Sequence, residues 1–323
     1  MHVCAVGWAS GARIRRSYRV SSKNLTYRGV PQADRLITAT LTNPVQEPLP
    51  QYVIPGHFCS PVPSADDLAR AVAAAAVPAP MLGIDMREAE QLAFLERLSC
   101  YYPDVQFPEH KDGSTRFAFN NPSYSWCDAI IFFCMLRELR PRRIIEVGSG
   151  YSSCLILDVN ELYFDWEIDC TFIEPYPELL HSLFKPQDPD RVKLVPSKLQ
   201  DVETTLFETL ETSDILFIDS SHVVKAGSDV LTLFANILPK LNVGTFIHFH
   251  DVFDRFEYPT EWLMQGRGWN EQYFLRVFLQ YNSSFRIKLF TPYMIARYGD
   301  WFRERMPDCF KNTGGHIWIE RVG

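Results

Sequence analysis

An apolar segment that runs directly into a glycine turn is the feature that most constrains the fold. Residues 144–147 are apolar apart from Glu146, and Gly148-Ser149-Gly150 follows at once. A helical pattern then begins near Ser152, so this stretch is predicted to form a strand, a tight turn and a helix. Such a unit in an α/β protein presents free backbone N–H groups and the positive end of a helix to a ligand. Glycine also allows the close approach that a Cβ would block.

Strand and helix patterns alternate from Arg143 to the end of the chain, as is typical of a mostly parallel sheet covered by helices. Seven strands are expected, at 144–147, 170–173, 192–195, 215–218, 245–249, 285–290 and 316–320. Helices are expected at 152–162, 178–183, 202–210, 226–237, 270–281 and around 300–306, with an earlier one that Ser125 caps and that ends before Pro141. The predicted fold is α/β, with a doubly wound, seven-stranded and mostly parallel sheet.

Three segments are predicted along the chain. Residues 1–62 are expected to be an irregular extension, because prolines interrupt its second half. Residues 63–115 are expected to form a helical cap of two helices, one capped by Ser64 and the other by Asp85. Residues 116–323 are expected to carry the sheet and the ligand site.

Charge, hydropathy and cysteine content limit the classes of function. The net charge of −7 over 323 residues argues against general nucleic-acid binding, which needs a basic surface. No apolar run reaches the roughly 18 residues that a membrane span requires. The eight cysteines are scattered, with no Cys-x-x-Cys pair, which indicates reduced thiols. We therefore expect a cytoplasmic protein without nucleic-acid or membrane partners. Homo-oligomers are left open, as is an organelle presequence within the first 33 residues, which lack Asp and Glu.

Acidic residues around the glycine turn indicate the kind of ligand. Ser153 stands where a dinucleotide-binding fingerprint would have its third glycine, and Glu146 suits a cationic ligand better than a pyrophosphate. Glu174, at the end of the next strand, is where a carboxylate can accept both hydroxyls of a ribose. Asp201, beside Gln200 after the third strand, could meet an adenine amino group. Each carboxylate could instead cap a helix or make a surface pair.

These residues resemble the motifs of the class I S-adenosylmethionine-dependent methyltransferases over about residues 116–323. The stretch from Glu146 to Gly150 is similar to their first motif, and Phe172-Ile173-Glu174-Pro175 to their ribose-binding motif. The resemblance implies a Rossmann-like fold with an antiparallel last pair of strands, an enzyme that transfers methyl groups, and S-adenosyl-L-methionine as cofactor. The cofactor-binding residues that it implies are Glu146, Gly148, Ser149, Gly150, Ser152, Glu174, Asp201 and Asp219.

A second group of polar side chains follows the fourth and fifth strands. Asp219-Ser220-Ser221-His222 follows the fourth strand, and His250-Asp251 ends the fifth. Both should lie at the same edge of the sheet, facing one crevice. Asp219, His250 and Asp251 could hold a divalent cation, and His222 could accept a proton from a hydroxyl. A metal-free site, or a polar network that only fixes the loops, is the alternative. His248 is expected to be a satisfied histidine of the core.

The spacing Asp219-x-x-His222 resembles the metal-dependent sugar and natural-product O-methyltransferases. That family carries a Glu-Asp pair after the fifth strand, where this chain has His250-Asp251. The departure leaves open whether a metal binds and whether it is Mg²⁺, since imidazole prefers softer metals. The resemblance implies O-methylation of a sugar or another small hydroxylated metabolite, with Asp219 and His222 as catalytic residues.

Aromatic and polar side chains after Asp251 are expected to line the acceptor pocket. They are Tyr258, Trp269, Asn270 and Tyr273, with Glu257 nearby, and any of them could equally be a helix cap or a core aromatic. Tyr124 and Asp128 are expected to close over the cofactor from the other side.

Two other functions fit part of this pattern. A nicotinamide-dependent oxidoreductase would use a similar sheet, but the missing third glycine and Glu146 argue against it. A non-catalytic cofactor-binding scaffold would not need Asp219 and His222 together.

Overall fold

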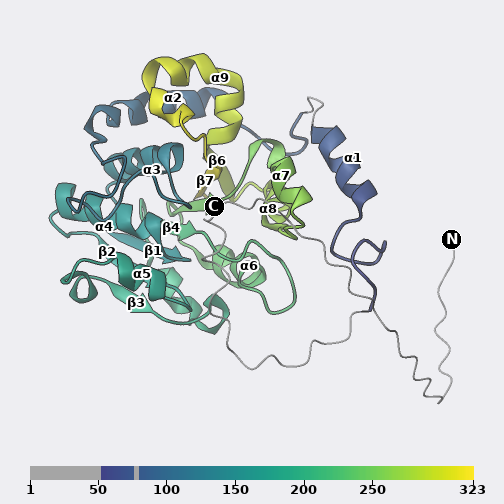
Figure 1. Ribbon diagram of the computed structural model, residues 1–323, viewed down its shortest axis with the longest axis horizontal. Coiled ribbons are helices and arrows are strands. Elements are labelled where there is room, and N and C mark those ends of the chain that lie inside the picture. Colours follow the sequence, from purple (N-terminus) through teal and green to yellow (C-terminus); the bar gives the residue numbers. More distant parts are fainter. Residues whose placement is uncertain (1–51, 76–79) are drawn as a thin grey trace, which may run out of the picture. The chain divides into compact units, whose positions relative to one another are not determined.

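A seven-stranded sheet organises the part of the chain that the structure describes (Figure 1). This computed structural model describes residues 52–75 and 80–323, so most of the expected extension 1–62 lies outside the described residues. The chain divides into two units, Met1–Tyr52 and Val53–Gly323, and the sheet belongs to the second. The strands are β1 (Arg143–Val147), β2 (Asp169–Ile173), β3 (Lys193–Val195), β4 (Ile215–Ile218), β5 (Phe246–His250), β6 (Phe285–Phe290) and β7 (His316–Arg321).

The strand order confirms the predicted doubly wound sheet. It is β3-β2-β1-β4-β5-β7-β6, with β1 to β5 parallel and β7 antiparallel to both β5 and β6. The central strands are buried along nearly their whole length, which explains why they are continuous apolar runs rather than alternating ones. The order reverses between β1 and β4. A ligand crevice is therefore expected outside the carboxyl ends of these two strands.

Helices connect most of the strands and cover the sheet (Figure 1). They are α3 (Trp126–Leu139), α4 (Tyr151–Tyr163), α5 (Glu178–Leu183), α6 (Asp229–Thr232), α7 (Thr260–Met264), α8 (Glu271–Leu279) and α9 (Thr291–Arg305). The helix expected around 300–306 is thus the second half of α9, which starts directly after β6 with Pro292 in its first turn. Among the described helices, none has both the length and the hydropathy that crossing a bilayer requires.

Two of the expected helices are wrong in type. The segment 202–210 contains a 3-10 helix (Thr204–Thr209) instead of an α-helix. Its threonines and valine are β-branched, which lowers the propensity for an α-helix. The segment 226–237 has only one α-helical turn, α6, followed by a π-helical turn (Leu233–Ile237). Pro239, in the 3-10 turn that comes next, cannot donate a backbone hydrogen bond and keeps the helix from continuing.

Helices α1 (Ala65–Ala75) and α2 (Glu88–Ser99) precede α3 in the chain. Ser64 caps α1 as expected, because its Oγ accepts a hydrogen bond from the Asp67 N–H at 3.1 Å. The expected cap at Asp85 is wrong, since Arg87, at φ 49°, precedes α2 and Asp85 accepts from its N–H instead. The buried face of α2 packs against α3, α9 and β6, so this helix belongs to the layer around the sheet.

Candidate active site

The glycine turn after β1 passes directly over the end of β4. Gly148 has φ 82°, and a Cβ on it would lie 1.7 Å from the carbonyl oxygen of Asp219. The two chain segments are joined here, because the Asp219 N–H donates to the Val147 carbonyl at 2.9 Å. Glycine at 148 is therefore required by the crossing of two backbones, and a side chain would push the strand ends apart.

Glu146 makes hydrogen bonds to the first turn of α4, directly after the glycine turn. Its fully buried carboxylate accepts hydrogen bonds from Ser152 Oγ at 2.6 Å and from Ser153 Oγ, and Ser153 Oγ in turn accepts from the Gly150 N–H at 3.0 Å. Burial raises the pKa of Glu146 to about 8, although the two serine hydrogen bonds oppose the shift. In this structure Glu146 stabilises the glycine turn and the start of α4 through these hydrogen bonds. Its contact with a cofactor stays a prediction.

Two neighbouring clefts lie at the carboxyl ends of β1, β2 and β4. The larger has a volume of about 590 Å³ and the smaller about 140 Å³. Both are lined by Gly148, Glu174 and Asp219, and the smaller one also by Tyr124, Ser149, Gly150 and Ser152. Glu146 and Asp201 line neither cleft. The other sequence-predicted cofactor residues therefore gather at one place.

Asp201 is exposed and lies outside the clefts, while Gln200 lines the larger one. The two residues belong to a 3-10 turn (Leu199–Asp201), in which successive side chains point about 120° apart. Only one of the pair can therefore face the cleft. The contact of Asp201 with an adenine amino group stays a prediction, and Gln200 is the member of the pair that lines the larger cleft.

Glu174 ties the end of β2 to the glycine turn. One of its carboxylate oxygens accepts from the Ser149 N–H at 3.1 Å and the other from the Tyr176 N–H at 2.8 Å. Burial raises the pKa of this carboxyl. The carboxylate also lines both clefts, so it can face a bound ribose from a fixed position.

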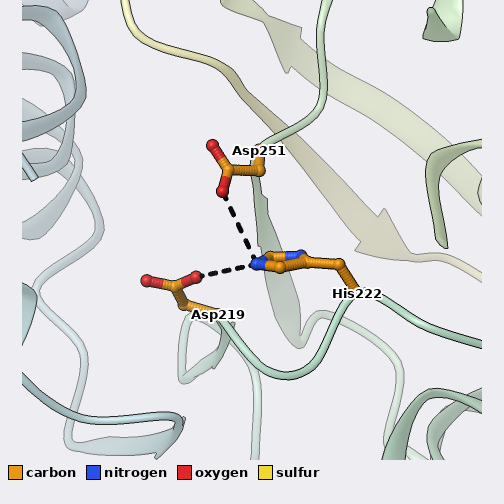
Figure 2. Close-up of side chains that lie close together, drawn as sticks. All are labelled: Asp219, His222 and Asp251. Atoms are coloured by element: carbon orange, nitrogen blue, oxygen red, sulfur yellow. Dashed lines mark ion pairs between the residues drawn. The ribbon is translucent and has the colours of Figure 1, made fainter. Parts of the chain in front are cut away.

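The residues after β4 and β5 meet beside the clefts (Figure 2). His222 Nε2 lies 3.3 Å from Asp219 Oδ1 and 3.5 Å from Asp251 Oδ2. One ligand-type atom from each of these three residues falls within 4.8 Å of the others, as a metal site requires. His250 lies next to them, with Nδ1 3.3 Å from Asp219 Oδ1 and 3.8 Å from Asp251 Oδ2. The whole predicted centre is thus assembled at one edge of the sheet.

A further carboxylate, which the sequence patterns did not reveal, completes this centre. Glu271, in the first turn of α8, is buried, and its Oε2 lies 2.8 Å from His222 Nδ1. The ring of Trp269 lies 4.4 Å from that of His222. The stretch Trp269-Asn270-Glu271 indicates an acceptor pocket and a helix start, but nothing in its spacing points to a residue 49 positions earlier.

The charges in the centre are strongly coupled. Burial alone would lower the pKa of His222, but its hydrogen bonds to Asp219 and Glu271 outweigh burial and raise the pKa to about 10. The carboxylates of Asp251 and Asp219 likewise raise the pKa of His250 despite burial. The surrounding carboxylates therefore favour the positively charged form of both imidazoles. His222 could act as a base only in its neutral form.

His250 is held on its other side by Asp128 of α3. The His250 Nε2 lies 3.6 Å from Asp128 Oδ2, and Asp128 Oδ1 accepts from His316 Nδ1 at 2.6 Å. Asp128 is buried and does not line the clefts, so the expectation that it closes over the cofactor is wrong, whereas Tyr124 does line the smaller cleft. His248 is in the core as expected, but both of its ring nitrogens lack a hydrogen-bond partner among the described residues.

The expected acceptor-pocket residues take different roles. Trp269 contacts His222, and Tyr258 is buried beside Trp269, with ring centres 6.1 Å apart. Tyr273 donates to Glu257. Asn270 is already used, because Oδ1 accepts from the Val224 N–H at 2.6 Å and Nδ2 donates to the Val224 carbonyl at 3.3 Å. Both polar atoms of the Asn270 side chain are thus engaged by the backbone of Val224, and the substrate role of Asn270 stays a prediction.

Comparisons with known proteins give two sequence matches to report. A family model described as a methyltransferase domain matches residues 145–252. An uncharacterized protein of Archaeoglobus fulgidus is 33% identical over 164 residues, which are 49% of this chain and 73% of that protein. The matched domain runs from within β1 to just past β5. It includes the glycine turn, Glu174 and Asp219, His222, His250 and Asp251 of the polar centre, whereas Glu271 lies beyond it.

Two solved structures among those found share little sequence with this chain. A methyltransferase of Podospora anserina bound to SAH is 18% identical, with a TM-score of 0.40 over 81% of this chain and 98% of that one. The O-methyltransferase TomG of Streptomyces achromogenes in complex with SAM is 14% identical, with a TM-score of 0.39 over 79% of this chain and 96% of that one.

Proposed function

This chain carries a methyltransferase domain over residues 145–252, and we propose that it is a class I S-adenosylmethionine-dependent methyltransferase that methylates an oxygen atom of a small hydroxylated acceptor. A sugar is the leading candidate for the acceptor. The acceptor class rests on the resemblance to metal-dependent sugar and natural-product O-methyltransferases and on the polar centre beside the clefts.

The shared position of Asp219 carries the proposal. Asp219 lines both clefts together with Gly148 and Glu174, and its Oδ1 lies 3.3 Å from His222 Nε2. A cofactor bound on the glycine turn would therefore adjoin the group of carboxylates and imidazoles. That adjacency is what a transferase needs, since the methyl donor and the acceptor hydroxyl must meet in line.

The larger cleft suits a nucleoside-sized ligand. Its volume of about 590 Å³ lies in the range of small-molecule sites. Glu174 can accept from ribose hydroxyls and Gln200 can meet the base. S-adenosylmethionine, when bound, would supply an electrophilic methyl group on a sulfonium. The sulfonium charge is lost during transfer, so the buried ring of Tyr124 beside the smaller cleft favours the reaction by excluding water.

A divalent cation fits between Asp219, Asp251 and one imidazole. The donor atoms of Asp219, His222 and Asp251 are within 4.8 Å of one another, and Asp219 and Asp251 bring the negative charge that a cation needs. With a nitrogen among the donors, Mn²⁺, Fe²⁺, Co²⁺ and Zn²⁺ suit the site as well as Mg²⁺. When bound, the cation would make an acceptor hydroxyl more acidic and fix its position. The acceptor hydroxyl would give its proton to Nε2 of a neutral His222, and its oxygen would bond to the methyl carbon as the carbon–sulfur bond of the cofactor breaks.

A labelling experiment tests the proposal. The full chain is incubated with S-adenosylmethionine carrying a labelled methyl group, and with sugars, hydroxylated aromatic compounds and amines, with and without EDTA. We expect label only on hydroxylated acceptors, an O-methyl signal in the product NMR spectrum, loss of transfer with EDTA, and loss in Asp219→Asn. Asp300→Asn, an exposed carboxylate on α9, serves as the matched control.

Three outcomes would contradict the proposal. Label on an amine or a carbon would overturn the oxygen acceptor. No S-adenosylmethionine binding in calorimetry would favour a non-catalytic scaffold. Thermal stabilisation by NADH alone would favour a nicotinamide-dependent oxidoreductase.

A further inference from the structure

One short segment, Trp269-Asn270-Glu271, surrounds His222 and holds it in place. The backbone N–H groups of Asn270 and Glu271 both donate to the His222 carbonyl, at 3.0 and 3.1 Å. Glu271 Oε2 lies 2.8 Å from His222 Nδ1, and the ring of Trp269 lies 4.4 Å from the imidazole. The backbone, one ring nitrogen and one ring face of His222 are therefore all engaged by the same segment.

The loop that carries His222 is pinned by the same segment. The Asn270 side chain makes two hydrogen bonds to the backbone of Val224, with its oxygen accepting and its nitrogen donating. His222 itself has φ 57°, in the left-handed region that is strained for a residue other than glycine. A loop without such support would relax this backbone, so the contacts with residues 269–271 maintain the position of the imidazole.

The hydrogen bond to Glu271 determines which nitrogen of His222 is available. A carboxylate can only accept, so Nδ1 donates to Glu271 and Nε2 is left facing Asp219 and Asp251. Glu271 is buried, and its Oε1 has no hydrogen-bond partner among the described residues, which keeps this carboxylate committed to the imidazole. A carboxylate behind a histidine is the usual arrangement at metal centres, where it orients the ring and raises its basicity.

We infer that Glu271 is a positioning residue that presents Nε2 of His222 as a protein ligand of the divalent cation, together with Asp219 and Asp251. His222 then takes the place that the sequence suggested for His250. His250 is oriented by a different carboxylate, because its Nε2 lies 3.6 Å from Asp128. The inference rests on the proposed cation-dependent function and deepens it, since it turns His222 from a base into a ligand.

Mn²⁺ bound to the full chain tests this assignment without any need for turnover. Electron spin echo spectroscopy detects the nitrogen of an imidazole that coordinates Mn²⁺. We expect an imidazole signal in the wild type, its loss in His222→Ala and its retention in His250→Ala. Calorimetry should give a Mn²⁺ affinity that is 10- to 100-fold lower in Glu271→Ala and largely rescued in Glu271→Gln, which can still accept from Nδ1.

Controls separate positioning from misfolding. Glu261→Gln changes an exposed glutamate on the neighbouring helix α7 and should leave Mn²⁺ affinity unchanged. Affinity for S-adenosylhomocysteine should stay at the wild-type value in Glu271→Gln, which shows that the fold is intact even if Glu271→Ala fails to fold.

The possible failures are distinguishable. An imidazole signal that disappears in His250→Ala and persists in His222→Ala would overturn the inference and leave the proposed function standing, as would an unchanged Mn²⁺ affinity in a folded Glu271→Ala. A wild type that does not bind Mn²⁺, yet transfers methyl groups in EDTA, would overturn both the cation and this assignment.

Discussion

Two single residues, Gly148 and Glu146, shape the turn over which a cofactor would lie, and they do so by different physics. Gly148 is needed because two backbones cross. Glu146 is a buried acid whose serine partners hold the start of α4. Each makes a separate prediction.

Replacing Gly148 by alanine should disrupt the crossing of β1 and β4. The new Cβ would lie 1.7 Å from the Asp219 carbonyl oxygen, a contact that the backbone can only relieve by moving. We expect Gly148→Ala to lower the free energy of unfolding by more than about 2 kcal/mol and to abolish S-adenosylmethionine binding. Urea unfolding and calorimetry measure both. Gly268→Ala, where a Cβ meets nothing within 4 Å, is the control, and equal losses in the two variants would contradict the explanation.

Glu146 should make the cofactor-free protein less stable as the pH rises. Burial raises the pKa of its carboxyl from 4.5 to about 8, so between these values the folded protein holds a proton that the unfolded chain releases. The free energy of unfolding therefore falls as the pH increases through this window. Glu146→Gln lacks the titration. Its stability relative to the wild type should improve by at most about 1.4 kcal/mol per pH unit between pH 6 and pH 8. Urea titrations at several pH values test this, and a constant difference would show that Glu146 does not titrate there.

At the level of helices and loops, buried polar contacts join segments that periodicity treats as independent. Arg116, before α3, is fully buried and pairs with Asp158 of α4 at 2.8 Å and with Asp188 at 2.5 Å. Glu161 also reaches the same guanidinium. This cluster attaches the loop preceding α3 to the helix that follows the glycine turn.

Removing Arg116 should destabilise the fold strongly. Arg116→Met would leave two buried carboxylates without their cation, which typically costs about 3–5 kcal/mol. The matched control is Arg70→Met, since Arg70 pairs with Asp67 on the exposed surface of α1, where such pairs contribute at most about 1 kcal/mol. Urea unfolding of both variants gives the comparison. Similar losses would mean that the buried cluster adds nothing beyond a surface pair.

For the protein as a whole, the proposed cation should behave as a stabilising ligand. A ligand that binds only the folded state raises the free energy of unfolding by about 2.7 kcal/mol at 100 times its dissociation constant. Thermal unfolding of the EDTA-treated chain should therefore shift upward as Mn²⁺ is added. Asp219→Asn and Asp251→Asn should remove the shift, while Asp300→Asn should retain it. A shift that survives in both centre variants would place the cation elsewhere.

Much of the fold and of the site is predictable from the chain because both depend on local patterns. Each expected strand is present, since apolar runs of four to six residues bounded by turns specify buried parallel strands. Parallel topology then brings the carboxyl ends of β1, β2, β4 and β5 to one edge. The amino-acid pattern is therefore enough to place Gly148, Glu174, Asp219 and Asp251 together.

Contacts between side chains from distant segments cannot be predicted in this way. Which nitrogen of His222 faces Asp219 and Asp251 depends on Glu271, and the Asn270 side chain binds Val224, which lies 46 residues earlier in the chain. Gln200 rather than Asp201 lines the cleft because a 3-10 turn sets the direction of each side chain. Periodicity specifies which face of an element is buried. The sequence alone therefore establishes the sheet, the glycine turn and the position of Glu174, Asp219 and Asp251 at one edge of the sheet. The partners and protonation of those acids arise from three-dimensional packing, because hydrogen-bond geometry depends on atoms that only the folded chain brings within about 3 Å of one another.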